Sequence, residues 1–143
     1  LRFEATGDLG SIVIDSHQVE RALLNLVTNA IKFTPAEGRV SVRAERTGDH
    51  MQFVVADNGI GIPEHEQQHL FTRFFRSSVA TENAIPGTGL GLAIVKHVAN
   101  NHGGSVSVWS EEGLGSTFTL RIPLDASASV AGDAPVDAVK GPT

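Results

Sequence analysis

Two asparagines and a lysine share one face of a predicted helix. Asn25, Asn29 and Lys32 are spaced i, i+4 and i+7, so their side chains point the same way. Amide oxygens can ligate Mg²⁺, and a lysine one turn further on can meet a phosphate as a point charge. Taken alone, the pattern also fits a solvated polar face. Because asparagine is a mediocre helix former, two of them inside a well-patterned helix favour a ligand-binding face.

A carboxylate stands at the end of a predicted strand and next to a glycine-rich loop. The segment reads Asp57-Asn58-Gly59-Ile60-Gly61. Such a carboxylate can accept a hydrogen bond from an exocyclic amine, while the glycines leave room for a flat ring. Taken alone, Asp-Asn-Gly is also typical of a tight turn.

The third feature is a run of glycines, Gly87-Thr88-Gly89-Leu90-Gly91-Leu92, that opens a predicted helix. Free N–H groups and the positive end of the helix dipole can hold phosphate there. No lysine follows the glycines, which excludes a P-loop, and Leu92 stands where a dinucleotide fingerprint needs a small residue. In this order, a metal-ligand face, an amine acceptor and a phosphate cradle predict a site for ATP·Mg²⁺.

The hydrophobic pattern predicts the elements that position these residues. Apolar residues from Val19 to Ile31 recur at helical spacing, and Pro35 ends that helix. Further elements are predicted as strands over 1–5 and 11–15, a hairpin over 39–56, a short helix over 64–70, a helix from Gly91 to Gly103 and a second hairpin over 105–122. The pattern indicates an α+β fold, a two-layer sandwich with a mixed sheet covered on one face by helices.

Composition narrows the class of protein. The chain of 143 residues has 11 Lys and Arg against 16 Asp and Glu, and no cysteine. An acidic chain without a basic run is a poor candidate for binding nucleic acid. No apolar run approaches the roughly 18–20 residues that span a bilayer, so we expect a cytoplasmic domain. Residues 1–124 are expected to form that domain, and residues 125–143, rich in Ala, Ser, Gly, Pro and Asp, a disordered tail. Because the chain begins at Leu1, it is expected to be part of a longer protein.

The sequence resembles the ATP-binding catalytic domain of bacterial sensor histidine kinases, in the superfamily that also holds gyrase, Hsp90 and MutL. Residues 25–35 resemble the N box, 57–62 the G1 box, 71–76 the F box and 87–92 the G2 box, and Gly115-Ser116-Thr117-Phe118 fits the closing motif. The resemblance covers residues 1–124 and implies a Bergerat-type fold with a mobile ATP lid over residues 62–86.

The resemblance also implies roles for the residues that match. Asp57 would accept the adenine amino group, supported through water by Thr117. Asn29 would ligate Mg²⁺, with Asn25 beside it. The remaining nucleotide contacts would come from Lys32, Phe33, Gly59, Ile60, Gly61, Gly87, Thr88, Gly89, Leu90, Gly91 and Leu92. Phe71 and Phe74 would anchor the lid, and Arg73 and Arg76 would reach the γ-phosphate or the partner domain. The implied catalytic residues are Asn25, Asn29, Lys32 and Arg76.

Asn25 bears on the reaction type. ATP-hydrolysing relatives place a glutamate there to polarise water, and an amide cannot serve as a general base. We therefore expect phosphoryl transfer to a histidine on a dimerisation domain outside this chain, followed by transfer to a response regulator. None of the six histidines here has the acceptor's sequence context. The isolated domain is expected to be monomeric and its parent to be anchored in the cell membrane. The alternatives are a serine kinase of the anti-sigma type and an ATP-gated switch.

Overall fold

A computed structural model describes residues 2–6, 16–78 and 89–123. The strands are β1 (Arg2–Thr6), β2 (Val40–Thr47), β3 (His50–Asp57), β4 (Ser105–Glu111) and β5 (Gly115–Pro123), and the helices are α1 (Ser16–Lys32), α2 (Glu64–Gln67) and α4 (Gly91–Asn101). The strand predicted over 11–15, residues Gly87 and Thr88, residues 79–86 of the predicted lid and the predicted tail over 125–143 lie outside the described residues.

The five strands form one mixed sheet in the order β1-β2-β3-β5-β4. β1 pairs with β2 in parallel, and the other three pairs are antiparallel. β5 is the last described strand along the chain, yet it lies between β3 and β4. The prediction of a mixed sheet is confirmed, as are both predicted hairpins.

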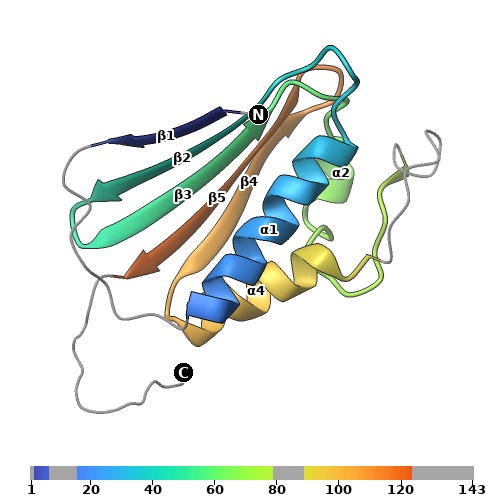
Figure 1. Ribbon diagram of the computed structural model, residues 1–143. Helices are drawn as coiled ribbons and strands as arrows, with labels where there is room; N and C mark the ends of the chain where they lie inside the picture. The colour runs from blue at the N-terminus through green and yellow to red at the C-terminus, as the bar shows by residue number, and fades with distance from the viewer. Residues whose placement is uncertain (1, 7–15, 79–88, 124–143) are drawn as a thin grey trace.

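Helices α1 and α4 pack side by side against one face of the sheet (Figure 1). Of the stripe that predicted α1, the helix buries Val19, Ala22, Leu26 and Ala30, whereas Ile31 at its end is 52% exposed. Beneath the helices lie the side chains of alternate sheet residues, among them Val55, Phe118, Leu120 and Ile122. Apolar burial between these layers is the main stabilising contribution to the fold. The predicted two-layer sandwich is confirmed.

Helix α2 is shorter than predicted. It ends at Gln67, whereas the pattern indicated a helix to Leu70. Around and beyond Gln67 the backbone forms tight four-residue turns, in which the N–H of His69 donates to the carbonyl of Glu66 and that of Thr72 to the carbonyl of His69, both at 3.0 Å. The turns still place Leu70 in the core, where its side chain is 6% exposed.

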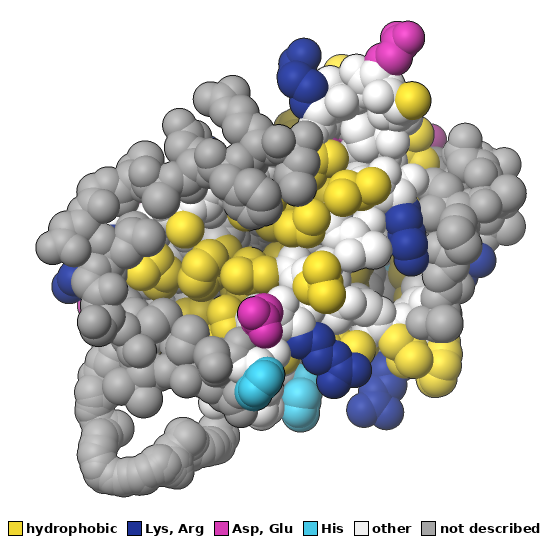
Figure 2. Space-filling view, in the orientation of Figure 1, with side chains coloured by type: hydrophobic (Ala, Val, Ile, Leu, Met, Phe, Trp, Pro, Cys, Tyr) yellow, Lys and Arg dark blue, Asp and Glu magenta, His cyan; other side chains and the backbone are white. Residues whose placement is uncertain are grey.

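On the helix-bearing side of the molecule, the described basic side chains are spread out. Figure 2 shows hydrophobic side chains gathered between the helices and the sheet, with Lys and Arg side chains spread around the rim of this face. In the described part of the chain, none of the helices has the length and apolar character needed to cross a bilayer.

Candidate functional site

The Asp57 carboxylate lies at the end of β3, on the side of the sheet that faces the helices. It accepts the backbone N–H of Gly59 at 2.8 Å and the backbone N–H of Ser116. Burial raises the pKa of Asp57 above the usual 3.8, and the two N–H donors oppose that rise. Asp57 is therefore a half-buried hydrogen-bond acceptor held in place by backbone groups from two segments.

The predicted support of Asp57 by Thr117 is wrong. In the β3–β5 register Asp57 lies opposite Ser116, whereas Thr117 lies opposite Ala56. Successive side chains of a strand point to opposite faces of the sheet. Ser116 is therefore on the helix-facing side with Asp57, and Thr117 is on the other face, opposite the exposed Trp109.

Ser116 and Ser110 are the polar residues beside Asp57 that the sequence prediction missed. Ser116 is 5% exposed, and its hydroxyl lies 2.7 Å from that of Ser110 on β4. The signal was present in the sequence. Because Phe118, Leu120 and Ile122 point into the core, Ser116 must share their face.

In the loop after Asp57, two glycines lie so close to the backbone of other segments that a side chain would not fit. A Cβ on Gly59 would lie 2.1 Å from the carbonyl oxygen of Phe33, and a Cβ on Gly61 would lie 2.1 Å from that of Glu111. Gly61 also has a positive φ of 72°. The Ile60 N–H donates to the Phe33 carbonyl at 3.1 Å. These glycines thus join the end of α1 to the turn between β4 and β5, and their contact with an adenine ring stays a prediction.

Asn25 on α1 faces the beginning of α4. Its Oδ1 lies 3.8 Å from the position of a Cβ on Gly91, and its Nδ2 is buried without a hydrogen-bond partner in the described structure. Asn29, one turn further on, is half-buried, and Lys32 is exposed. The structure thus brings Asn25 of α1 against the glycine-rich start of α4.

The residues before α4 contact the turn that contains Phe74. Gly89 has a φ of 81°, and its carbonyl accepts the Phe74 N–H at 2.7 Å. A Cβ on Gly89 would lie 2.6 Å from the carbonyl carbon of Phe74. Leu90 and Leu92, on either side of Gly91, are half-buried, and the Leu90 carbonyl accepts the Ile94 N–H.

The two phenylalanines predicted to anchor the lid have different environments. Phe71 packs against the core and meets Phe118 edge to face, with ring centroids 6.2 Å apart. Phe74 is 69% exposed and has a φ of 66°, so its side chain is not a packing anchor as predicted. Phe75 takes that place, half-buried and in contact with the His69 ring. Arg73 and Arg76 are exposed.

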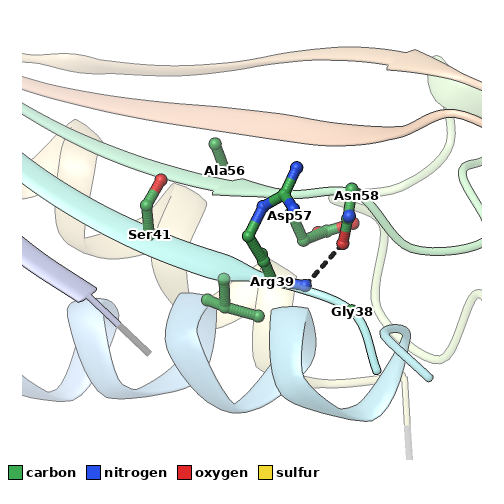
Figure 3. A pocket seen from close by; sticks show the side chains of 7 residues that line it. Gly38, Arg39, Ser41, Ala56, Asp57 and Asn58 are labelled. Carbon is green, nitrogen blue, oxygen red and sulfur yellow. Dashed lines mark hydrogen bonds between the residues drawn. The ribbon is translucent and has the colours of Figure 1, made fainter. Parts of the chain in front are cut away.

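A pocket of about 380 Å³ lies where β2 begins and β3 ends. Its lining comprises Gly38, Arg39, Val40, Ser41, Ala56, Asp57 and Asn58. In Figure 3 the Ser41 and Ala56 side chains point away from α1, and the Asn58 carboxamide accepts the Arg39 N–H at 2.6 Å. Of the residues predicted to bind a nucleotide, only Asp57 lines this pocket, and none of its lining residues comes from α1 or α4.

The donor set suits a magnesium ion that keeps phosphate and water ligands. The described residues contain no group of three or more His, Cys, Asp or Glu that could hold a metal. The side chain shown to face the start of α4 is instead the amide of Asn25, whose buried Nδ2 has no hydrogen-bond partner in the described structure; its N–H groups can donate to a phosphate oxygen, and its Oδ1 can ligate a metal. Because Mg²⁺ is usually held by one or two protein oxygens together with phosphates, the amide oxygens of Asn25 and Asn29 fit this ion.

Residues 14–126 match the family model described as histidine kinase-, DNA gyrase B- and HSP90-like ATPase. The chain is 47% identical over 121 residues to the sensor-like histidine kinase SenX3 of Mycolicibacterium smegmatis. That match covers 85% of this chain and 30% of the relative, so the chain spans less than a third of the relative's length.

Two solved structures have the same fold. The mycobacterial sensor histidine kinase MprB is 37% identical, with a TM-score of 0.73 over 86% of this chain and 83% of that chain. The histidine kinase ThkA, solved in complex with the response regulator protein TrrA, is 26% identical, with a TM-score of 0.69 over 87% of this chain and 34% of that chain.

Proposed function

The chain belongs to the family of histidine kinase-, DNA gyrase B- and HSP90-like ATPases, and on that basis we propose that it binds ATP with Mg²⁺ and phosphorylates a histidine on another domain. It is an ATP-binding catalytic domain homologous to those of sensor histidine kinases. Residues 1–124 form this domain in the proposal, and residues 125–143 follow it as a tail.

The meeting of Asn25 with Gly91 is the observation that supports the proposal most directly. It joins Asn25 of α1 to the glycine-rich start of α4, where the N–H groups of the first helical turn have no acceptor within the helix and can hold phosphate. Asp57 lies at the end of β3, where Gly59 packs against the Phe33 carbonyl at the end of α1 and donates its N–H to the Asp57 carboxylate. Asp57 thus offers a carboxylate acceptor near the end of α1. A nucleotide that lies along α1 would place its adenine at Asp57 and its phosphates at α4.

In the proposed mechanism the chain's own residues bind and orient the nucleotide. Asp57 accepts a hydrogen bond from the adenine amine. The N–H groups around Gly89 and Gly91 hold the phosphates, and Lys32 meets them at the end of α1. Asn29, with Asn25 beside it, would hold Mg²⁺, which supplies neutralisation of phosphate charge. In the transfer, the bond from the γ-phosphorus to the bridging oxygen breaks as a bond to an imidazole nitrogen forms.

Asn25 favours transfer over hydrolysis. An amide cannot take a proton from an attacking water, so the site has no general base at the position nearest the start of α4. The acceptor histidine then lies on a dimerisation domain outside this chain, and a response regulator collects the phosphoryl group afterwards. The parent protein would hold this domain on the cytoplasmic side of a membrane.

The proposal is tested by mixing the purified domain with Mg²⁺, γ-labelled ATP and the dimerisation domain of its own parent protein. We expect label on a histidine, recognised because phosphohistidine is labile in acid. The Asn29→Ala variant should lose transfer while it retains ADP binding, and Asn100→Ala, an exposed asparagine on α4, serves as the matched control. Acid-stable label would indicate the serine kinase alternative, and nucleotide binding without any label would indicate the switch.

A further inference from the structure

Three polar side chains form a row across one end of the helix-facing side of the sheet. Asp57 on β3 lies opposite Ser116 on β5, and Ser116 lies opposite Ser110 on β4. The adjacent row on the same side is apolar, formed by Val55, Phe118 and Val108. Buried polar groups in such a place need hydrogen-bond partners, so the protons within the row have to be accounted for.

The hydroxyl of Ser110 uses all of its hydrogen-bonding capacity. It donates its one hydrogen to the Gly115 carbonyl at 2.9 Å, and it accepts the backbone N–H of Ile62 at 2.9 Å. Its third contact is the Ser116 hydroxyl at 2.7 Å. A hydroxyl has one hydrogen and two lone pairs. Because the hydrogen of Ser110 goes to Gly115, Ser116 is the donor in the contact between the two hydroxyls.

Ser110 is itself held in position by α2. The Gln67 side chain donates to the carbonyl of Ser110 at 2.9 Å and to the carbonyl of Ile62 at 3.0 Å. These bonds fasten the Ile62 segment along β4, so the N–H of Ile62 stays directed at the Ser110 hydroxyl. The direction of the Ser116 hydrogen is thus fixed within the protein, before a ligand binds, by the hydrogen bonds of Ser110 with Gly115 and Ile62 and by Gln67.

The consequence is a pair of acceptors at the end of the sheet. The hydrogen of the Ser116 hydroxyl is used toward Ser110, which leaves its lone pairs for a ligand. The Asp57 carboxylate is acceptor-only when ionised, and it is fixed by the N–H groups of Gly59 and Ser116. A purine with a 6-amino group offers two hydrogens to such a pair, whereas a 6-oxo group offers only lone pairs.

We propose that Ser110 is a positioning residue that fixes the Ser116 hydroxyl as an acceptor and so makes the site select 6-aminopurine over 6-oxopurine nucleotides. This inference rests on the proposed binding of adenine at Asp57. Ser110 does not touch the ligand; it acts through Ser116. The preference arises because a 6-oxo group would face two acceptors and leave a buried polar group unpaired.

The test is calorimetry of the purified domain with ADP and with inosine diphosphate, its 6-oxo counterpart. The quantity measured is the ratio of the two dissociation constants. In Ser110→Ala the Ser116 hydrogen is free to turn toward a 6-oxo group, so we expect the preference for ADP to fall about five- to tenfold, the worth of one neutral hydrogen bond. Ser110→Thr, which keeps the hydroxyl, should keep the ratio, and so should Ser107→Ala on the exposed face of β4.

Ser116→Ala gives a second measurement that does not require Ser110→Ala to fold. It removes the acceptor, so ADP should bind more weakly and the preference should fall. Adding Ser110→Ala to this variant should leave the ratio unchanged. The inference is overturned if Ser110→Ala weakens both nucleotides equally, or if Ser116→Ala leaves the preference intact. Failure of the unaltered domain to bind ADP would instead overturn the proposed function.

Discussion

Asp57 and Ser116 lie directly opposite each other on β3 and β5, and the backbone N–H of Ser116 donates to the Asp57 carboxylate. The carboxylate is therefore set by the sheet register as well as by its own loop. Its position beside Ser116 determines which substitutions should affect nucleotide binding.

The Asp57→Asn variant should bind ADP about 30-fold more weakly or worse. The amide would direct a donor either at the adenine amine or at one of the two backbone N–H groups, and an unpaired buried group costs about 2 kcal/mol. Calorimetry measures the affinity. Asp49→Asn, in an exposed turn, is the matched control because the Asp49 side chain is 89% exposed. Equal affinity in Asp57→Asn and the unaltered domain would refute the adenine contact.

Asp57 should also make the nucleotide-free domain less stable as pH rises. Because burial raises its pKa above 3.8 in the folded chain, the protonated form is favoured by folding. Its contribution is present below the unfolded pKa and is lost as pH rises through the higher folded pKa. Melting temperatures of the unaltered domain and of Asp57→Asn should be compared from about pH 3 to pH 7. The melting temperature of the unaltered domain should fall relative to that of the variant as pH rises above 3.8. A constant difference would contradict the raised pKa.

Thr117→Val should leave ADP affinity within about twofold of the unaltered domain, as expected for a surface substitution away from the site. The reason is that Thr117 lies on the sheet face opposite to Asp57. If the hydroxyl of Thr117 reached the nucleotide, directly or through water, its loss would weaken binding about tenfold. Calorimetry on Thr117→Val beside Ser116→Ala separates these outcomes.

Gly59→Ala should destabilise the domain by about 3 kcal/mol, at the upper end of the usual cost of overpacking. The added Cβ would meet the backbone carbonyl of Phe33, which cannot turn aside as a side chain can. Gly48→Ala is the control, since Gly48 also lies in a turn, has a φ of 61° and has nothing within 4 Å of an added Cβ. Its cost should be about 1 kcal/mol, from backbone strain alone. Urea unfolding of the two variants checks the difference, and equal losses would show that Phe33 does not constrain the loop.

Phe74→Asn should leave stability unchanged or raise it by about 0.5 kcal/mol, because asparagine tolerates the left-handed backbone that phenylalanine adopts there. The Phe74 side chain is 69% exposed and contributes little packing. Phe71→Ala should cost about 3 kcal/mol, since Phe71 packs on Phe118 and the core. Urea unfolding measures both, and a loss above about 1 kcal/mol in Phe74→Asn would show that its ring is held.

Much of the fold was predictable because its elements have clear hydrophobic periods. The stripe from Val19 to Ile31 predicted α1, and the alternation of Phe118, Leu120 and Ile122 predicted β5. The same alternation places Ser116 and not Thr117 with Asp57, so that error came from carrying a role over by motif without applying the strand period. The order β3-β5-β4 was not predictable, because no local pattern states which non-consecutive strands pair.

The sequence predicted which residues belong to the candidate site better than it predicted which of them touch one another. The face of Asn25 and Asn29 and the acceptor Asp57 followed from spacing and position. The approach of Gly59 to Phe33 and of Gly61 to Glu111 depends on tertiary packing, which a linear sequence does not display. Phe74 was misassigned because an aromatic residue in an apolar pattern suggests burial, whereas the residue lies in a turn with a positive φ and its side chain is exposed.

The place of β5 between β3 and β4 has a consequence for the order of events during translation. Ser110 and Asp57 are synthesised before Ser116, but they have no row to join until β5 inserts between their strands. A ribosome-bound chain that stops before Gly115 therefore has the strands β1, β2 and β3 on one side and β4 alone on the other, without the strand that joins them. Nascent chains should acquire nucleotide affinity abruptly, once the segment through Pro123 has left the exit tunnel, and not in steps as each motif emerges.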